Sequence, residues 1–80
     1  MSAKRQAIIQ HLSTQLRDER LRQHLSMTEV AARAGIDRTM VMRVEERERT
    51  PTIELLLRIA EALDVDLWKL LRDATKATEK

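Results

Sequence analysis

The chain has 80 residues, of which 42% are hydrophobic, enough for one small core and one domain. It has no cysteine, which excludes a disulfide framework and a cysteine-based zinc site, and it has one Trp but no Phe or Tyr, which disfavours a sheet-rich fold. The 15 basic and 13 acidic side chains leave a net charge of +2, too small by itself to indicate a nucleic-acid partner.

The basic side chains are concentrated in the N-terminal part of the chain. Residues 1–50 hold ten Lys or Arg and seven Asp or Glu, a balance of +3, whereas residues 51–80 hold five and six, a balance of −1. Arginine dominates the basic part, and its planar guanidinium donates two hydrogen bonds at once to a phosphate or a guanine. An ordinary solvated helical surface explains this distribution equally well.

No segment of the sequence indicates a membrane or an export signal. No apolar run approaches the ~18 residues that a membrane span needs. The first residues carry charge but lead into no apolar signal-peptide region. We therefore expect a soluble, cytoplasmic protein with no membrane partner.

Helix-forming residues dominate, with only one Gly and one Pro, and they predict an all-α fold. The first helix is predicted over residues 4–24, because Leu12 and Leu16, with Ile8 or Ile9, recur at intervals of three or four.

Four shorter helices are predicted after the first, each opened by a residue of a type that caps helices. Ser26 has Glu29 three residues later, which is the pattern of a capping box. The four helices and their capping residues are 27–34 (Ser26), 38–47 (Asp37), 53–63 (Thr52) and 67–74 (Asp66). These boundaries predict one domain over residues 1–74 and a frayed tail over residues 75–80.

The single glycine, Gly35, lies between the second and third predicted helices. A left-handed residue at this point ends one helix and turns the chain sharply into the next. Small and branched apolar side chains surround it at the spacing of two inner helix faces: Val30, Ala31, Ala34, Ile36, Val41 and Val44. Two short helices that cross steeply at such a corner are typical of a helix-turn-helix.

Residues 27–46 resemble the helix-turn-helix of the phage-repressor and Cro family, also called Xre-type. The similarity extends over residues 12–71, since residues 51–63 and 65–71 are similar to the family's fourth and fifth helices. It implies a five-helix, lambda-repressor-like DNA-binding domain and a sequence-specific transcriptional regulator. It further implies a repressor that binds a palindromic operator in double-stranded DNA as a homodimer. The family also carries a buried ion pair between the first helix and the recognition helix, and Arg20 and Glu45 occupy those positions.

The candidate base contacts follow from the geometry of the third predicted helix. Val41, Val44 and Glu45 point inward, so the opposite face projects outward. In this family that face enters the major groove. The outward residues are Arg38, Thr39, Met42, Arg43 and Glu46. The two arginines suit guanine O6 and N7, Met42 suits a thymine methyl, and Glu46 suits a cytosine amino group. Thr39 suits a base edge, a thymine methyl or a phosphate.

The candidate phosphate contacts lie at helix starts and beside the third helix. The N–H groups of a first helical turn have no partner within the helix and favour a phosphate. The candidates are Met27, Thr28, Arg33, Arg47, Arg49, Thr50 and Thr52.

The last predicted helix carries more apolar residues than one small helix needs to bury. We expect these residues to form the dimer interface, with Trp68 as its anchor. They are Leu67, Trp68, Leu70 and Leu71. The alternative is that Trp68 covers the core of its own monomer.

Several residues depart from the family pattern. Met27 stands where relatives commonly have Gln, Arg47 and Asp64 each replace a common Gly, and Asp37 places a negative charge near an expected phosphate. These departures leave open an alternative, an antitoxin or protein-interaction module on the same fold, with a toxin or other protein partner and weak or no DNA binding. The setting also stays open between a phage repressor, a restriction-modification controller and an antitoxin.

Nothing in the sequence indicates an enzyme, a metal site or a cofactor. No arrangement resembles a nucleophile with a base and an orienting group. His11 and His24 have no third metal ligand at helical spacing.

Overall fold

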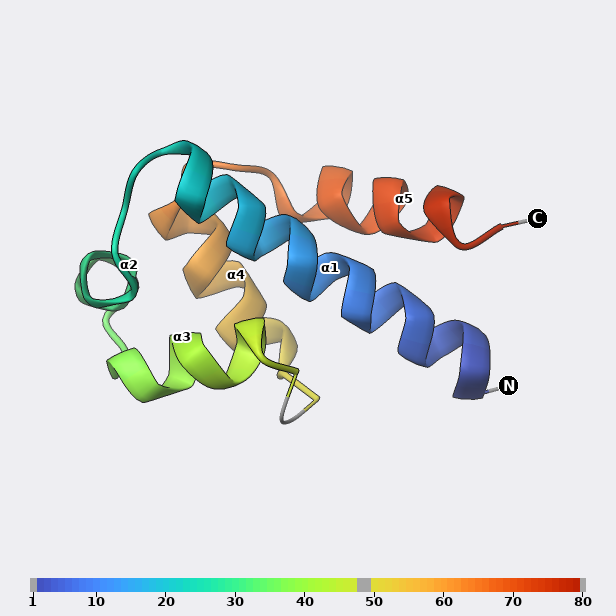
Figure 1. Ribbon diagram of the computed structural model, residues 1–80, viewed down its shortest axis with the longest axis horizontal. Helices are drawn as coiled ribbons and strands as arrows, with labels where there is room; N and C mark the ends of the chain where they lie inside the picture. The colour runs from blue at the N-terminus through green and yellow to red at the C-terminus, as the bar shows by residue number, and fades with distance from the viewer. Residues whose placement is uncertain (1, 48–49, 80) are drawn as a thin grey trace.

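The computed structural model describes residues 2–47 and 50–79 and contains five helices in that part of the chain (Figure 1). The helices are α1 (Ser2–Arg22), α2 (Met27–Ala34), α3 (Arg38–Glu45), α4 (Ile53–Ala62) and α5 (Leu67–Ala77). No strand occurs among the described residues. The predicted all-α, five-helix fold is therefore confirmed.

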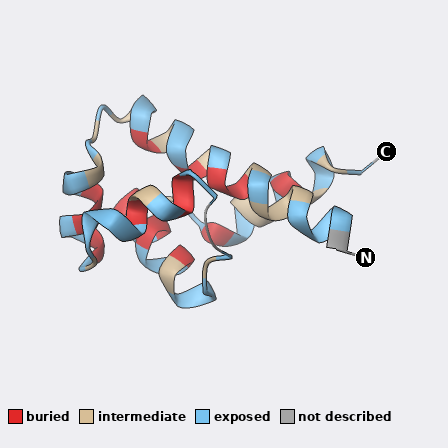
Figure 2. Ribbon diagram, turned by 60° about the horizontal axis from the view of Figure 1, so that its bottom comes forward, coloured by how far each residue is buried: buried red, intermediate tan, exposed pale blue. Residues whose placement is uncertain are grey.

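The long helix α1 organises the molecule, because it packs on both α5 and α3 (Figure 1). Helix α2 packs on α3 and α4, which completes a core of mainly aliphatic side chains. Leu12, Leu16, Val30, Val41 and Leu63 are each no more than 2% exposed. Figure 2 shows the buried residues gathered on the inner faces of the helices, with exposed residues on the outer faces. The core thus holds α3 at the edge of the molecule with one face in the interior.

Two of the four predicted helix caps form the expected side-chain hydrogen bonds. Ser26 Oγ accepts from the N–H of Glu29 (3.0 Å), and Glu29 Oε1 accepts from the N–H of Ser26 (2.8 Å), which completes the capping box. Thr52 Oγ1 accepts from the N–H of Leu55 (3.1 Å). Asp37 and Asp66 occupy the cap positions with extended backbone, but their side chains accept no capping hydrogen bond. These two aspartates are caps by position and backbone conformation alone.

A left-handed residue follows each of the first four helices. Their φ angles lie between 58° and 71°, and the residues are His24, Gly35, Arg47 and Asp64. Such a residue directs the chain out of the helix axis. The conformation explains why α1 ends at Arg22 and α3 at Glu45, two residues before their predicted ends.

The last helix continues beyond its predicted end. Helix α5 extends to Ala77, so residues 75–77 are helical where a frayed tail was expected. The cause is tertiary packing, because Ala74 is fully buried and α5 packs along α1. No described helix is long and apolar enough to cross a bilayer.

Candidate nucleic-acid interface

The corner between α2 and α3 is built on Gly35. Its φ of 71° is the left-handed conformation predicted for it, and the N–H of Ile36 donates to the carbonyl of Ala31 (3.0 Å) across the turn. A side chain at position 35 would bring its Cβ to 3.4 Å from Nη1 of Arg58, in a backbone conformation that L-residues rarely adopt. The glycine therefore suits the turn and the close approach of α4.

Arg58 of α4 supports this corner from outside the two-helix motif. Its Nη1 donates to the carbonyl of Ala34 (3.2 Å), the last residue of α2. Its Nε and Nη2 lie 3.1 Å from a carboxylate oxygen of Glu54, one turn earlier in α4. A cation at the carbonyl end of a helix is favourable because that end carries a partial negative charge. Arg58 was not predicted as part of the site, since a hydrogen bond across 24 residues leaves no local pattern in the sequence.

The ion pair implied by the family resemblance is present between α1 and α3. Arg20 Nε lies 2.7 Å from Glu45 Oε2, and Arg20 Nη2 lies 2.9 Å from Glu45 Oε1. Arg20 Nη1 also donates to the carbonyl of Leu25 (2.9 Å), in the segment before α2. The hydrogen bonds to Glu45 raise the pKa of Arg20, with burial opposing the shift. One guanidinium thus joins α1, the segment before α2 and the inner face of α3.

The outer face of α3 is free of the core. Val41, Val44 and Glu45 are buried, as their inward positions predict. Among the five outward residues, Met42 is half-buried, and the four exposed ones are Arg38, Thr39, Arg43 and Glu46. In the view of Figure 1, α3 forms the lower edge of the molecule, on the far side of α1 from α5. Four of the five predicted base-contacting residues therefore share one exposed ridge, and Met42 lies at its border.

A hollow lies beside this ridge on the side of α4, and we call it the α4-side hollow. It has a volume of about 140 Å³ and lies between α3 and the start of α4. Its lining includes Met40, Arg43, Thr50, Pro51 and Thr52. Two predicted phosphate contacts, Thr50 and Thr52, therefore lie next to a predicted base contact, Arg43.

A second hollow lies beside the ridge on the side of α1, and we call it the α1-side hollow. Its lining comprises Thr14, Arg17, Arg20, Met27, Glu45, Glu46 and Arg47. Positions 40, 43 and 44 lie on one flank of α3, and positions 45 and 46 lie on the other, because a helix turns once in 3.6 residues. The two hollows thus border the ridge on opposite sides, and each includes the start of a neighbouring helix.

This geometry is that of a helix-turn-helix, and the family comparison agrees. A family model described as helix-turn-helix matches residues 16–67, more than half of the chain. The chain belongs to the Xre/lambda-repressor-like helix-turn-helix family. Members of this family are DNA-binding transcription regulators and are generally not enzymes. Searches of the curated proteins and of the solved structures found no match.

Not every predicted contact of this helix-turn-helix lies at the ridge. Arg33 lines a different hollow, between α2 and α4, together with Gly35, Leu57 and Arg58. Arg33 lies at the end of α2, whereas Met27 and Thr28 lie at its start. The three predicted phosphate contacts of this segment are therefore not together. Arg49 lies outside the described residues. Within residues 2–47 and 50–79, no group of His, Asp and Glu is arranged to hold a metal ion.

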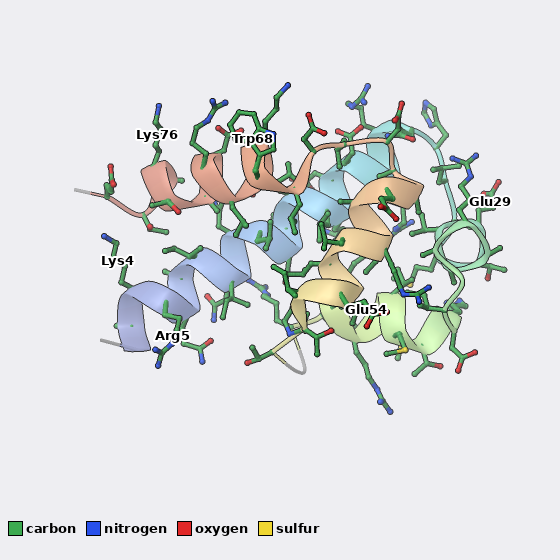
Figure 3. All side chains as sticks on the ribbon, turned by 180° about the vertical axis from the view of Figure 1, so that it is seen from behind. Lys4, Arg5, Glu29, Glu54, Trp68 and Lys76 are labelled. Carbon is green, nitrogen blue, oxygen red and sulfur yellow. The ribbon has the colours of Figure 1, made fainter. Side chains whose placement is uncertain are left out.

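The predicted dimer residues are divided between the interior and the surface. Leu67 is buried in the core, and Leu70 and Leu71 are half-buried against it. Trp68 is 59% exposed, so it does not cover the core of its own monomer. Figure 3 shows Trp68 on the outer side of α5. Two exposed apolar residues of α4, Ile53 and Leu57, were not among the predicted interface residues.

Proposed function

We propose that this helix-turn-helix protein is a sequence-specific repressor that binds a near-palindromic operator as a homodimer, with α3 in the major groove. A basic, convex ridge bordered by a hollow on each flank carries the proposal. A helix in the major groove meets base edges with its outer face and has a phosphate backbone on either side. Such a regulator acts where the DNA is, in the cytoplasm of a prokaryotic cell.

The base contacts are assigned to the ridge of α3. Arg38 and Arg43 bind guanine through paired hydrogen bonds, each with about 1–3 kcal/mol of discrimination. Thr39 contacts a base edge or a thymine methyl, and Glu46 accepts from a cytosine amino group. Half-buried Met42 contributes an apolar contact at the border of the ridge.

The phosphate contacts are assigned to the two flanks of α3. On the side of α1 they are the first turn of α2, at Met27 and Thr28, and the exposed side chain of Arg47. On the side of α4 they are Thr50 and Thr52. Thr52 Oγ1 accepts the capping hydrogen bond, so its hydroxyl proton stays available for a phosphate oxygen.

The dimer interface is assigned to an apolar strip on α4 and α5, comprising Ile53, Leu57, Trp68 and Leu71. Ile53 and Leu57 are one helical turn apart on one face of α4, and they are 62% and 45% exposed. Leu57, Trp68 and Leu71 line a common hollow. The strip begins next to Thr52, and a two-fold axis through it pairs the same surface of both copies.

A salt titration on duplex DNA, followed by operator selection from random duplexes, tests the proposal. We expect log K to fall with log salt at a slope that corresponds to several phosphates. We also expect the selected sequences to contain two inverted half-sites about one helical turn apart, ~34 Å. A protein that binds no duplex at low salt refutes the proposal.

The apolar strip favours a second candidate, a protein-interaction module such as an antitoxin. An exposed tryptophan that shares a hollow with an exposed aliphatic residue, Leu57, is typical of a protein-binding surface. The same titration separates the two functions, because a module that has lost DNA binding shows no salt-dependent binding to duplex DNA.

A further inference from the structure

We propose that α1 takes part in DNA binding through Arg17, which binds a backbone phosphate in the α1-side hollow. The inference rests on the proposed entry of α3 into the major groove. It extends the contact surface to a helix outside the two-helix motif and outside the residues that the sequence analysis selected.

The α1-side hollow lies where a phosphate backbone would pass. The α1-side hollow mirrors the α4-side hollow across the ridge, because each lies on one flank of α3 and each includes the start of another helix. Two phosphate backbones border a helix in the major groove. If the strand on the side of α4 meets Thr50 and Thr52, the strand on the opposite side meets the α1-side hollow.

The α1-side hollow carries a net positive charge. Its lining contains three arginines and two glutamates. Arg20 and Glu45 neutralise each other in their buried ion pair. The remaining charged side chains are Arg17, Arg47 and Glu46, with a net charge of +1. The hollow therefore favours an anion.

The side chain of Arg17 has no partner among the described residues. Its side chain is exposed and forms no ion pair or hydrogen bond with the described residues. The positions one helical turn away in either direction, 13, 14, 20 and 21, carry no acidic residue. Arg22 of the same helix, by contrast, pairs with Glu19. The donors of the Arg17 guanidinium are therefore available to a ligand, whereas those of Arg20 in the same hollow are used by Glu45 and Leu25.

The start of α2 borders the same hollow, since Met27 is part of its lining. The amides of Met27 and Thr28, in the first turn of α2, donate no hydrogen bond within the described part of the chain. The Thr14 hydroxyl, also on α1, donates to the carbonyl of Gln10 (3.1 Å) and is therefore not available to a phosphate. The geometry thus points to one phosphate held by the Arg17 guanidinium and the start of α2.

The test compares duplex binding by the wild type, Arg17→Gln, Arg17→Lys and Lys76→Gln over a range of salt concentrations. Both Gln substitutions remove one positive charge. Lys76 is the matched control because it lies on the outer side of α5, across the molecule from α3 (Figure 3). The probe is a short duplex of random sequence, and thermal unfolding verifies that each variant is folded.

We expect Arg17→Gln to make the slope of log K against log salt shallower by about 0.9, the value for one phosphate contact. At low salt its affinity falls about three- to tenfold. Arg17→Lys keeps the slope, and Lys76→Gln changes neither quantity. If Arg17→Gln gives the same slope and affinity as Lys76→Gln, Arg17 does not bind a phosphate.

A methylphosphonate scan of the selected operator then locates the contact. One neutral substitution beside the major groove should weaken binding by the wild type and have no further effect on Arg17→Gln. Identical scans for the two proteins refute the assignment. A wild type that binds no duplex at low salt refutes the proposed function and this inference together, whereas normal binding by both proteins refutes the inference alone.

Discussion

The guanidinium of Arg20 and the carboxylate of Glu45 form two hydrogen bonds, of 2.7 and 2.9 Å, that join α1 to the inner face of α3. The two side chains are only 10% and 4% exposed. Because each charge depends on the other, Arg20→Met or Glu45→Leu alone should lower the free energy of unfolding by about 3 kcal/mol. Urea unfolding measures this loss.

The double variant Arg20→Met/Glu45→Leu is the informative companion to these single changes. It removes both charges, so it should be more stable than either single variant. Arg22→Met is the control, because the Arg22 side chain is 71% exposed, so the loss of its ion pair with Glu19 should leave the unfolding midpoint nearly unchanged. Equal losses for the double and single variants would show that packing, and not an unpaired charge, sets the cost.

Arg38 and Arg43 should determine base preference. We expect Arg38→Ala and Arg43→Ala each to lose discrimination of about 1–3 kcal/mol at one base pair of the selected half-site. Arg47→Ala should instead weaken binding to all sequences alike, as removal of a phosphate contact does. Repeated operator selection with each variant makes the comparison. Uniform weakening by Arg38→Ala or Arg43→Ala would contradict their assignment to bases.

Two left-handed residues should respond oppositely to substitution. Gly35→Ala places a Cβ at φ 71° and 3.4 Å from Arg58, and should lower the free energy of unfolding by about 1 kcal/mol. Asp64→Gly removes the backbone strain of a non-glycine residue at φ 58° and should raise the free energy of unfolding by about 0.5–1 kcal/mol. Thermal unfolding of both variants tests the pair. A stabilised Gly35→Ala protein would contradict the account of the corner.

The stability of the protein should fall in acid through Glu29. The hydrogen bond from the backbone N–H of Ser26, followed by that from its hydroxyl, lowers the pKa of Glu29 below 4.5. A carboxylate with a lowered pKa in the folded state stabilises the fold above its unfolded-state pKa, and this contribution disappears as pH falls through the folded-state value. The loss should therefore begin below about pH 4.5.

Glu29→Gln tests this dependence, because a glutamine oxygen accepts the same hydrogen bond at every pH. Its urea midpoint should change less than that of the wild type between pH 7 and acid. Glu79→Gln, near the far end of α5, should behave as the wild type does. The account fails if Glu29→Gln and the wild type lose stability in parallel.

The apolar strip should control self-association. Trp68→Ser and Ile53→Ser should each shift the monomer–dimer equilibrium towards monomer in sedimentation measurements, without a large change in unfolding temperature, because both side chains are mostly exposed in the monomer. The Arg72 guanidinium lies 5.1 Å from the centre of the Trp68 ring and favours a fixed ring position. Lys76→Ser is the surface control. Dimers that persist in both variants would place the interface elsewhere.

The sequence predicted best the features that local chemistry encodes. The bounds of α2 agree with the prediction at both ends, because Ser26 and Glu29 mark its start and Gly35 marks its end. The end of α3 was predicted two residues late, since Arg47 adopts a left-handed conformation that glycine would have signalled. The length of α5 was missed because the burial of Ala74 against the rest of the fold is a tertiary effect.

The candidate site divides in the same way. Helical periodicity predicted which residues of α3 face outward, since that depends only on the spacing of Val41, Val44 and Glu45. It did not separate Arg33 from the ridge, nor did it associate Arg17 with Met27 and Arg47. Those relationships depend on how α1 and α4 pack around α2 and α3, and the periodicity of a single helix does not predict that packing.

The contacts that Arg20 and Arg58 make with residues 27–46 have a consequence for transplanting that segment. Both arginines lie outside residues 27–46, and each bonds directly to a residue of that segment. A peptide cut to the segment, or a graft of it onto another scaffold, loses both braces together with the aliphatic surface that covers its inner side. We therefore expect a transplanted DNA-sequence preference to require the whole five-helix domain. A new specificity is better engineered by exchanging the outward side chains of α3 within this protein.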